Sequence, residues 1–278
     1  MSHDRIPLAA VIGSPIEHSR SPALHGYWLR KYGVNGHYVP MNITQEDLPE
    51  VIKTLPKMGF VGANVTIPHK QTVLDLADSV SDRAAVIGAA NTLIFRPDGT
   101  LMADNTDGHG FFENLKQYAP DWDPKTGPAA VFGAGGAARA IIHTLLRAGA
   151  PKLCLSNRTR SRAEDLRREF GTKIEVWDWN EAGDMLIDAT TVVNTTSLGM
   201  VGQEEFKVPL DKLRTDAVVN DLVYTPLETE FLASARAKGC TVVDGLGMLL
   251  HQAVPGFERW FGTRPEVDDD LRETVLNA

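Results

Sequence analysis

A run of glycines stands directly between a strand pattern and a helix pattern in the middle of the 278-residue chain. The residues are Val131-Phe132-Gly133-Ala134-Gly135-Gly136-Ala137-Ala138, which fit G-x-G-x-x-A. The first glycine permits a tight turn, and the second lets the backbone approach a pyrophosphate closely. The following helix would present unpaired N–H groups to phosphate oxygens. Because a strand precedes the motif and a helix follows it, the motif predicts a dinucleotide site rather than a glycine-rich loop without a ligand.

The residues after the next strand indicate which dinucleotide is bound. That strand ends at Leu155-Ser156-Asn157 and is followed by Arg158-Thr159-Arg160-Ser161-Arg162. An acid in the place of Arg158 would accept hydrogen bonds from a ribose 2′-hydroxyl and repel a 2′-phosphate, whereas arginine offers charge-assisted bonds to that phosphate. The sequence therefore favours NADP over NAD. Arg160 is interpreted as part of a solvated helix start.

Short apolar runs rich in β-formers alternate with amphipathic helical segments along the whole chain, a pattern typical of α/β proteins with parallel sheets. From Ala129 onward the pattern predicts about six parallel strands, as in a Rossmann-type doubly wound domain. After the strand at Ala129 and the strand that ends at Asn157, the remaining strands are predicted at Lys173–Val176, Thr191–Asn194, Ala217–Leu222 and Thr241–Asp244. Thr225-Pro226-Leu227-Glu228 is interpreted as a capping box with proline at the first helical position.

The first hundred residues form a second α/β layer. Strands are predicted at Leu8–Gly13, His37–Ile43 and Ala63–Ile67, with helices that start near Pro22, Gln45 and Pro68. Two further strands, Asn91–Phe95 and Thr100–Asn105, form a predicted hairpin around a Pro-Asp-Gly turn. If Phe95 faces Thr100, then Asn91 faces Asp104, and Asn91 and Asp107 emerge at the same end of the hairpin. The domain junction is placed near Asp107.

Composition excludes several classes of function. The formal charge of −8 and the absence of a Lys/Arg run argue against nucleic-acid binding. The N-terminal residues lack a targeting pattern, and no stretch approaches the roughly 20 apolar residues that span a bilayer. The two cysteines, Cys154 and Cys240, lie in apolar runs without a CxxC pair or His cluster, so we expect a reduced, cytoplasmic protein without a metal site. The sequence leaves the oligomeric state open, with a homodimer as one possibility.

Lys70 follows a buried strand in Gly62-Ala63-Asn64-Val65-Thr66-Ile67-Pro68-His69-Lys70. If Pro68 begins a helix, Lys70 is its third residue and faces the positive end of the helix dipole, which costs a charged lysine roughly 0.3 to 1 kcal/mol. A locally unfavourable choice of this kind is expected at functional sites. The same field disfavours the ammonium form, which suits a group that gives and takes a proton. The alternative is an exposed lysine at a helix end.

Four other polar residues are candidates for the same site. Asp107 lies between a strand and a helix, where it is either an N-cap or an active-site residue. Ser21 precedes Pro22 and could cap the first helix, whereas Ser19 has no such role, and both would suit a polyhydroxylated ligand. Gln252 falls on an apolar helical stripe, so its amide points inward and needs a partner, which a substrate hydroxyl could be. Val254-Pro255 should kink or end that helix.

Taken together, these segments resemble shikimate dehydrogenases over essentially the whole chain. The motifs in the first half are Ser19-Arg20-Ser21-Pro22, Asn64 to Lys70, Gly88-Ala89-Ala90-Asn91-Thr92 and Asp104-Asn105-Thr106-Asp107-Gly108. Those in the second half are Gly133 to Ala137, Asn157-Arg158-Thr159, Asn194 to Met200, Asp221-Leu222-Val223-Tyr224 and Asp244 to Leu249. The Val254-Pro255 dipeptide departs from the family, which usually continues there with good helix formers.

The resemblance implies a role for each matching residue. Lys70 and Asp107 would be catalytic, and Ser19, Ser21, Thr66, Asn91, Tyr224 and Gln252 would surround a small-molecule substrate. The NADP site would consist of Gly133, Ala134, Gly135, Gly136, Ala137, Asn157, Arg158, Thr159, Arg162, Leu222 and Gly245. It further implies a substrate-binding domain of residues 1–107, rejoined by 247–278, a nucleotide-binding domain of residues 108–246, and a cleft between them.

The reaction expected from this resemblance is reversible hydride transfer between NADPH and 3-dehydroshikimate, with Lys70, oriented by Asp107, on the carbonyl oxygen and Ser19 and Ser21 on the ring carboxylate. One alternative is a quinate/shikimate dehydrogenase of broader specificity. Arg158 argues against the NAD-using members of that group. A non-catalytic NADP-binding regulator would need no Lys70 and Asp107 pair. A folate-linked dehydrogenase would have no evident use for the paired serines.

Overall fold

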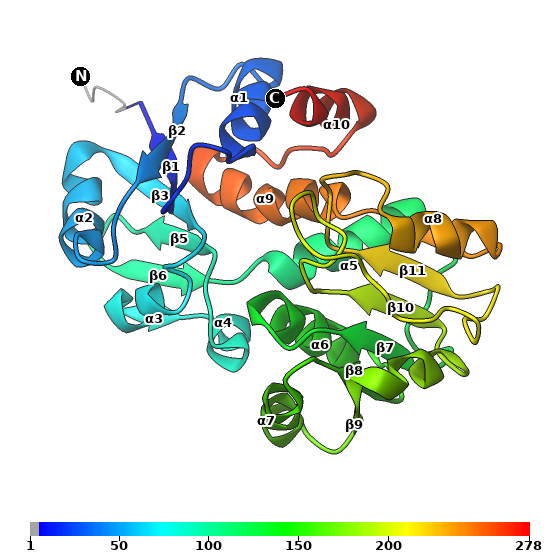
Figure 1. Cartoon of the computed structure of the whole chain (residues 1–278). Coiled ribbons are helices and arrows are strands. Elements are labelled where there is room, and N and C mark those ends of the chain that lie inside the picture. Colours follow the sequence, from blue (N-terminus) through cyan, green and yellow to red (C-terminus); the bar gives the residue numbers. More distant parts are fainter. Residues whose placement is uncertain (1–5) are drawn as a thin grey trace. The chain divides into compact units, whose positions relative to one another are not determined.

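The computed structural model describes residues 6–278, so the first five residues of the segment inspected for a targeting signal lie outside it. The chain divides into two compact units. Unit 1 comprises the described residues up to Thr106 together with Leu250–Ala278, and unit 2 comprises Asp107–Leu249. Each unit contains one six-stranded sheet (Figure 1). No helix within residues 6–278 has the length and apolarity needed to cross a membrane.

Unit 1 has a mixed sheet with the strand order β2-β1-β3-β5-β6-β4. β1 pairs in parallel with β2 and β3, whereas β5 runs antiparallel to both β3 and β6. The strands are β1 (Leu8–Gly13), β2 (His37–Asn42), β3 (Phe60–Val65), β4 (Ser79–Val80), β5 (Thr92–Phe95) and β6 (Leu101–Asp104). The inner strands β1, β3 and β6 are mostly buried, whereas β5 is buried only in its first two residues.

Helices on both sides complete unit 1. They are α1 (Ser21–Lys31), α2 (Leu48–Thr54), the 3₁₀ helix η1 (Leu55–Met58), α3 (Thr72–Leu76), α4 (Asp82–Ile87), the later part of α9 (Leu246–Phe261) and α10 (Asp269–Leu276). Trp260 of α9 donates its indole N–H to the Leu93 carbonyl at 3.0 Å. Phe257 packs edge-on against Trp28 of α1. These contacts attach the C-terminal residues to the first sheet, and α10 lies beside α1 (Figure 1).

Unit 2 has an entirely parallel sheet with the order β12-β11-β10-β7-β8-β9, which confirms the Rossmann-type prediction. Its strands are β7 (Ala129–Phe132), β8 (Leu153–Ser156), β9 (Ile174–Trp177), β10 (Thr191–Asn194), β11 (Val218–Asp221) and β12 (Thr241–Val243). Its helical elements, which lie on both faces of the sheet (Figure 1), are α5 (Asp107–Tyr118), α6 (Gly136–Ala148), α7 (Arg160–Phe170), the 3₁₀ helix η2 (Trp179–Leu186), α8 (Glu230–Ala237) and the start of α9.

The hairpin of unit 1 forms, but its predicted register is wrong by one residue. Phe95 faces Leu101 and Thr92 faces Asp104. The reason is that Arg96 N–H already bonds to the Thr100 carbonyl at 2.9 Å, so the loop is closed by those two residues. Asn91 N–H still donates to the Asp104 carbonyl at 3.0 Å, so Asn91 lies beside the end of β6.

Two predicted helix starts in unit 1 are also wrong. Pro68 and Lys70 belong to a turn, in which His69 N–H donates to the Thr66 carbonyl at 2.9 Å, and α3 begins only at Thr72. The dipole argument for Lys70 therefore does not apply. The helix expected near Gln45 begins at Leu48, after a turn in which Thr44 Oγ1 accepts the Asp47 N–H.

The predicted capping box at Thr225–Glu228 is not the start of α8. Thr229 is the N-cap residue, and its hydroxyl accepts the Leu232 N–H. The same hydroxyl donates to Asp221 at the end of β11, which fixes where the helix can begin. Conversely, α9 does not end at Pro255 but continues to Phe261. Buried Val254 and Phe257 flank the proline and hold this stretch of the helix in place.

Candidate active site

Strand directions bring the predicted substrate residues of unit 1 to one edge of its sheet. Parallel strands β1 and β3 end at the same edge. Because β5 is antiparallel to β3 and β6 is antiparallel to β5, β5 starts and β6 ends there too. The loops at this edge therefore carry Ser19 and Ser21 after β1, Thr66 and Lys70 after β3, Asn91 before β5, and the Asn105–Thr106 segment after β6.

Asn91 is the centre of a buried hydrogen-bond network at this edge. Its Oδ1 accepts bonds from the Thr92 hydroxyl at 2.9 Å and from the Thr106 backbone N–H and hydroxyl at 2.9 and 3.0 Å. Its Nδ2 donates to Gln252 Oε1 at 3.0 Å. All four residues are at most 9% exposed. Asn91 thus fixes both the Gln252 amide and the backbone immediately before Asp107.

The Gln252 amide points inward, as its helical stripe predicts, and its oxygen already has a protein partner in Asn91. The sequence alone leaves a substrate hydroxyl as a candidate for that partner. Because satisfied buried networks are rigid, the protein itself holds the Gln252 amide in place, and a substrate hydroxyl that contacts Gln252 would bind to an amide already fixed.

The loop after β3 is attached to the same region through its backbone. Ala90 N–H donates to the Lys70 carbonyl at 2.8 Å, and Val65 N–H donates to the Asn91 carbonyl at 2.9 Å. The buried ring of His69 contacts the Ile43 carbonyl through Nε2 at 2.7 Å. Lys70 itself is half-buried at the surface of this loop. The backbone carbonyl of the lysine itself is therefore bonded to the residue directly before Asn91.

Thr66 packs directly against the end of β1. A Cβ added to Gly13 would lie 2.5 Å from Thr66 Cγ2 and 3.1 Å from the Ile67 carbonyl oxygen. Ser14 N–H donates to that carbonyl at 3.1 Å. Only glycine allows the serine-bearing loop after β1 to approach the threonine so closely.

The paired serines contact each other rather than cap α1. Ser21 is the first residue of α1, the N-cap position is Arg20, and no side chain caps the helix. Ser19 Oγ accepts the Ser21 N–H at 3.3 Å. The capping interpretation of Ser21 is therefore wrong, because a serine inside the first turn is past the N-cap position.

Asp104 supports the segment that leads to Asp107. Arg83 of α4 forms a bidentate pair with the Asp104 carboxylate at 2.6 and 2.5 Å, and Ser81 donates to it at 2.6 Å. Burial raises the pKa of this carboxyl, but the bonds from Arg83 and Ser81 outweigh it and hold the pKa below its ordinary value. The carboxylate also accepts the Asn105 N–H. Asp107 follows two residues later, buried as the first residue of α5 in unit 2.

The glycine loop of unit 2 lies where the motif predicts, between β7 and α6. Gly133 has φ +106, and a Cβ there would lie 2.5 Å from Thr195 Oγ1, so glycine is required both conformationally and sterically. A Cβ on Gly135 or Gly136 would meet nothing within 4 Å. The loop is thus tight against the protein at its first glycine and open at the next two, beside the N-terminus of α6.

The residues directly after β8 hydrogen-bond to this loop and carry the basic side chains. Asn157 Oδ1 accepts the Ala134 N–H at 3.1 Å, and its Nδ2 donates to the Thr159 carbonyl at 2.8 Å. Arg158 is 64% exposed in its side chain and pairs with Glu204 at 2.8 Å. Arg162 is exposed in the first turn of α7. Arg160 pairs with Glu164 and Asp178, as expected of a solvated helix start.

The remaining predicted nucleotide residues lie at the ends of β11 and β12. A Cβ on Gly245 would lie 2.2 Å from the Leu222 carbonyl oxygen, so the two backbones touch. Asp221, just before Leu222, is bonded by Asn194, Val223 and Thr229. No cation pairs with it among the described residues, and burial raises its pKa to about 6 despite these bonds. Tyr224 follows in the loop after β11 and is half-buried.

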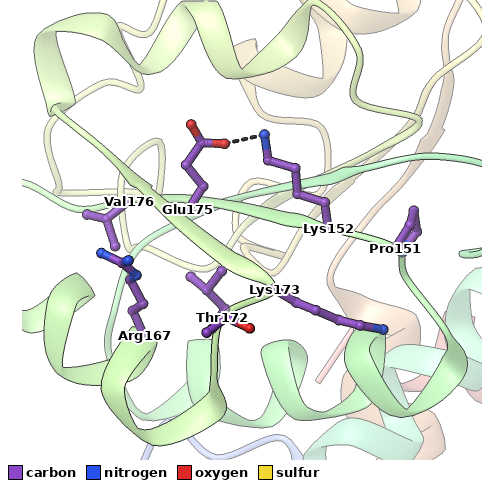
Figure 2. Close-up of a pocket in the computed structure, with 8 residues that line it drawn as sticks. Pro151, Lys152, Arg167, Thr172, Lys173, Glu175 and Val176 are labelled. Carbon is purple, nitrogen blue, oxygen red and sulfur yellow. Dashed lines mark ion pairs between the residues drawn. The ribbon is translucent and has the colours of Figure 1, made fainter.

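A basic groove of about 530 Å³ lies at the opposite edge of the unit 2 sheet, at the amino ends of β8 and β9. Figure 2 shows Lys152, Lys173 and Arg167 around it, with Lys152 paired to Glu175. In a parallel sheet the amino and carboxyl edges lie apart, so this groove is separate from the glycine loop. Within residues 6–278 no cluster of His, Cys, Asp and Glu has the composition of a metal site.

Family models match three parts of the chain. Residues 11–93 match the shikimate dehydrogenase substrate binding domain, residues 116–222 match shikimate / quinate 5-dehydrogenase, and residues 245–273 match the shikimate 5'-dehydrogenase C-terminal domain. The shikimate dehydrogenase (NADP(+)) of Cereibacter sphaeroides is 68% identical, over 99% of this chain and 98% of its own length. That of Paracoccus denitrificans is 65% identical, over 97% and 96%. The chain belongs to the shikimate dehydrogenase family.

Solved structures of this family share the fold over nearly the full length. The shikimate 5-dehydrogenase of Thermus thermophilus in complex with NADP(H) and shikimate is 36% identical, with a TM-score of 0.87 over 98% of this chain and 99% of that one. The quinate dehydrogenase of Corynebacterium glutamicum in complex with NAD is 32% identical, with a TM-score of 0.91 over 98% and 99%. The chain is therefore a shikimate-pathway oxidoreductase with NADP as its cofactor, and these folds include relatives that bind either nicotinamide cofactor.

Sequence reasoning missed four residues that hold the unit 1 site together: Tyr38, Asn64, Thr92 and Thr106. The Tyr38 hydroxyl donates to Asn64 Oδ1 at 2.7 Å, and Asn64 Nδ2 donates to the Asn91 carbonyl at 3.1 Å. One signal could have revealed Asn64, because a polar residue in the middle of an otherwise buried strand needs a partner.

Proposed function

We propose that the chain interconverts shikimate and 3-dehydroshikimate with Lys70 and Asp107 as catalytic residues. The observation that carries this proposal is the Asn91 network, which joins Gln252, Thr106 and the Lys70 loop at one edge of the unit 1 sheet. Amides and hydroxyls arranged in this way suit a ligand with several hydroxyl groups, because each hydroxyl both donates and accepts.

The nucleotide fits unit 2 on structural grounds. The open space beside Gly135 and Gly136 and the exposed N–H groups at the start of α6 form a cradle for a pyrophosphate. Gly133 to Ala137, Leu222 and Gly245 would hold the dinucleotide, and Asn157 would hold the loop in shape. Arg158, Thr159 and Arg162 would receive the 2′-phosphate, with Arg158 exchanging its exposed pair with Glu204 for the phosphate.

The chain's own residues perform the acid–base part of the reaction. Lys70 donates a proton or hydrogen bond to the carbonyl oxygen as that oxygen becomes a hydroxyl, and accepts it in the reverse direction. Asp107 orients the ammonium group and stabilises its charge. Asn91, Gln252, Thr66 and Tyr224 hold the ring hydroxyls, while Ser19 and Ser21 receive the ring carboxylate. When bound, NADPH supplies the hydride for the ketone carbon.

The deciding experiment is a steady-state assay of shikimate and of quinate with each of NADP and NAD. The proposal expects the highest kcat/KM for shikimate with NADP. A preference for quinate with NAD would favour the activity named for the Corynebacterium glutamicum relative and would contradict the role given to Arg158.

The domain assignment is part of the same proposal. Residues 1–107 and 247–278 form the substrate-binding and catalytic domain, and residues 108–246 form the NADP-binding domain. Support comes from Trp260, which bonds to β5 of the first sheet, and from Phe257, which packs against Trp28 of α1. Limited proteolysis with each ligand alone tests the assignment, because shikimate should protect the first domain and NADP⁺ the second.

We also propose a cytoplasmic location and a homodimer. Cys154 and Cys240 are buried and free, as suits a reducing compartment. Light scattering distinguishes the homodimer from a monomer of 30.4 kDa.

A further inference from the structure

Tyr38 is the one buried residue of edge strand β2, where it lies opposite Ala9 of β1. Its hydroxyl donates to Asn64 Oδ1 at 2.7 Å. Asn64 in turn donates to the Asn91 carbonyl at 3.1 Å and contacts the Thr92 hydroxyl at 3.5 Å. A continuous series of buried hydrogen bonds therefore runs from the tyrosine hydroxyl to Asn91.

On its other side Tyr38 faces α1. The ring of His25 stacks on the Tyr38 ring with a centroid distance of 3.9 Å and an interplanar angle of 9°. Ser21 precedes His25 by four residues on the same helix and so presents its side chain to the same face. Burial raises the pKa of the Tyr38 phenol well above its ordinary value, and the adjacent Ser21 hydroxyl offsets part of that rise.

His25 acts here as a neutral ring. It is fully buried, and burial lowers its pKa to about 3. Neither ring nitrogen has a hydrogen-bond partner among the described residues. Trp28, Phe257 and Trp260 surround it at centroid distances of 5.8, 5.9 and 5.7 Å. The histidine thus fixes the plane of the tyrosine ring and the direction of its hydroxyl.

We infer that Tyr38 is a positioning residue for the substrate: its hydroxyl holds Asn64, which bonds to the Asn91 carbonyl and so fixes Asn91 at the hydroxyl end of the site. This inference rests on the proposed function, in which Asn91 binds shikimate. Because Tyr38 acts through Asn64 and Asn91 and not on the reacting oxygen, it controls the KM for shikimate rather than kcat.

Tyr38→Phe tests the inference, since it removes the hydroxyl and keeps the ring stack. The KM for shikimate should rise roughly 3- to 10-fold, the effect of losing about one hydrogen bond, while kcat and the KM for NADP stay unchanged. Tyr27→Phe is the matched control, because the Tyr27 hydroxyl bonds to Asp268 in the same unit, away from the network. The control should leave all three constants unchanged.

A double-mutant cycle with Asn64→Ala separates positioning from a general packing role. If Tyr38 acts through Asn64, the double variant should raise KM by less than the product of the two single effects. Fully multiplicative effects would overturn the inference. A lower melting temperature with an unchanged KM would show that Tyr38 is merely structural.

His25→Ala provides a second route if Tyr38→Phe does not fold. It leaves every hydroxyl in place but removes the ring that holds the phenol, so KM for shikimate should again rise with kcat unchanged. An unchanged KM in folded His25→Ala or Tyr38→Phe would overturn the inference. Absence of shikimate turnover in the wild-type protein would instead overturn the proposed function, so the two failures are distinguishable.

Discussion

The two units organise polar groups at their functional edges in different ways. In unit 1 the edge is built from side chains, with Asn91, Thr92, Thr106 and Gln252 buried and bonded to one another. In unit 2 it is built largely from backbone, with glycines that leave open space and an N-terminal helix turn without a side-chain cap. Unit 1 therefore presents a pre-formed set of amides and hydroxyls, whereas unit 2 presents open backbone and, in the proposed function, sets cofactor choice with the exposed Arg158 and Arg162.

The largest effect should come from Lys70, the proposed proton donor at the side-chain edge of unit 1. Lys70→Ala should lower kcat by roughly 10²- to 10⁴-fold, with little change in the KM for shikimate, because the ammonium acts on charge that develops at the oxygen. Lys53→Ala, at an exposed position on α2, is the control. Near-normal turnover of Lys70→Ala would remove the lysine from the mechanism.

The next prediction concerns Asp107, the first residue of α5 and the proposed catalytic partner of Lys70. Asp107→Asn should lower kcat by about 10²-fold or more while the melting temperature is retained, because the amide is nearly isosteric and can still serve a helix start. Kinetics and thermal melting are measured on the same sample. Lost stability with intact specific activity would mean that Asp107 only supports the helix.

A third prediction concerns Arg158, an exposed residue of the proposed nucleotide site in unit 2. Arg158→Asp should lower the ratio of kcat/KM for NADP to that for NAD by roughly tenfold or more, because a charge-assisted contact to the 2′-phosphate is replaced by repulsion. Thr159 and Arg162 can retain part of the preference. An unchanged ratio would show that Arg158 serves only its surface pair with Glu204.

A smaller effect is expected where one network bond is removed from the substrate edge. Gln252→Ala removes the bond from Asn91 Nδ2 to Gln252 Oε1, and Ser19→Ala removes a proposed carboxylate contact. Each should weaken shikimate binding roughly 3- to 10-fold, the worth of about one hydrogen bond, and NADP binding less. Equal loss for both ligands would indicate a folding defect rather than a lost substrate contact.

The smallest effects concern stability, where buried aspartates of the two units should respond to pH in opposite ways. Asp104 has a lowered pKa, so its stabilising contribution is present above pH 3.8 and is lost as the pH falls further. Asp221 has a pKa raised from 3.8 to about 6, so stability from this group falls as the pH rises through that window and is constant above it.

Melting temperatures against pH check both signs. Asp104→Asn should cost about 2 to 4 °C near neutral pH and less in acid, since the Arg83 guanidinium is partly exposed. Asp221→Asn should abolish the decline between pH 4 and 6. If the melting temperatures of both variants depended on pH in the same way, the causes assigned to the two pKa shifts would be contradicted.

The sequence predicted the strand-rich architecture of both units and the place of the glycine loop, because local periodicity and glycine chemistry determine them. It did not predict the hairpin register, which depends on the Arg96–Thr100 pair, nor the start of α3, which depends on the turn between Thr66 and His69. The hydrogen-bond partners of Asn64 could not be predicted either, because they depend on the pairing of Asn64 with Thr92, which lie on two strands far apart in sequence.

Calorimetric titration of shikimate and of NADP⁺ into Asn91→Ala and Gly133→Ala tests most directly the division between the two edges. Asn91→Ala should lose most of its shikimate affinity and keep its NADP⁺ affinity. Gly133→Ala should do the reverse, because a Cβ at φ +106 would collide with Thr195 in the glycine loop. If each variant weakens both ligands to the same extent, the separate assignment of substrate to unit 1 and cofactor to unit 2 is contradicted.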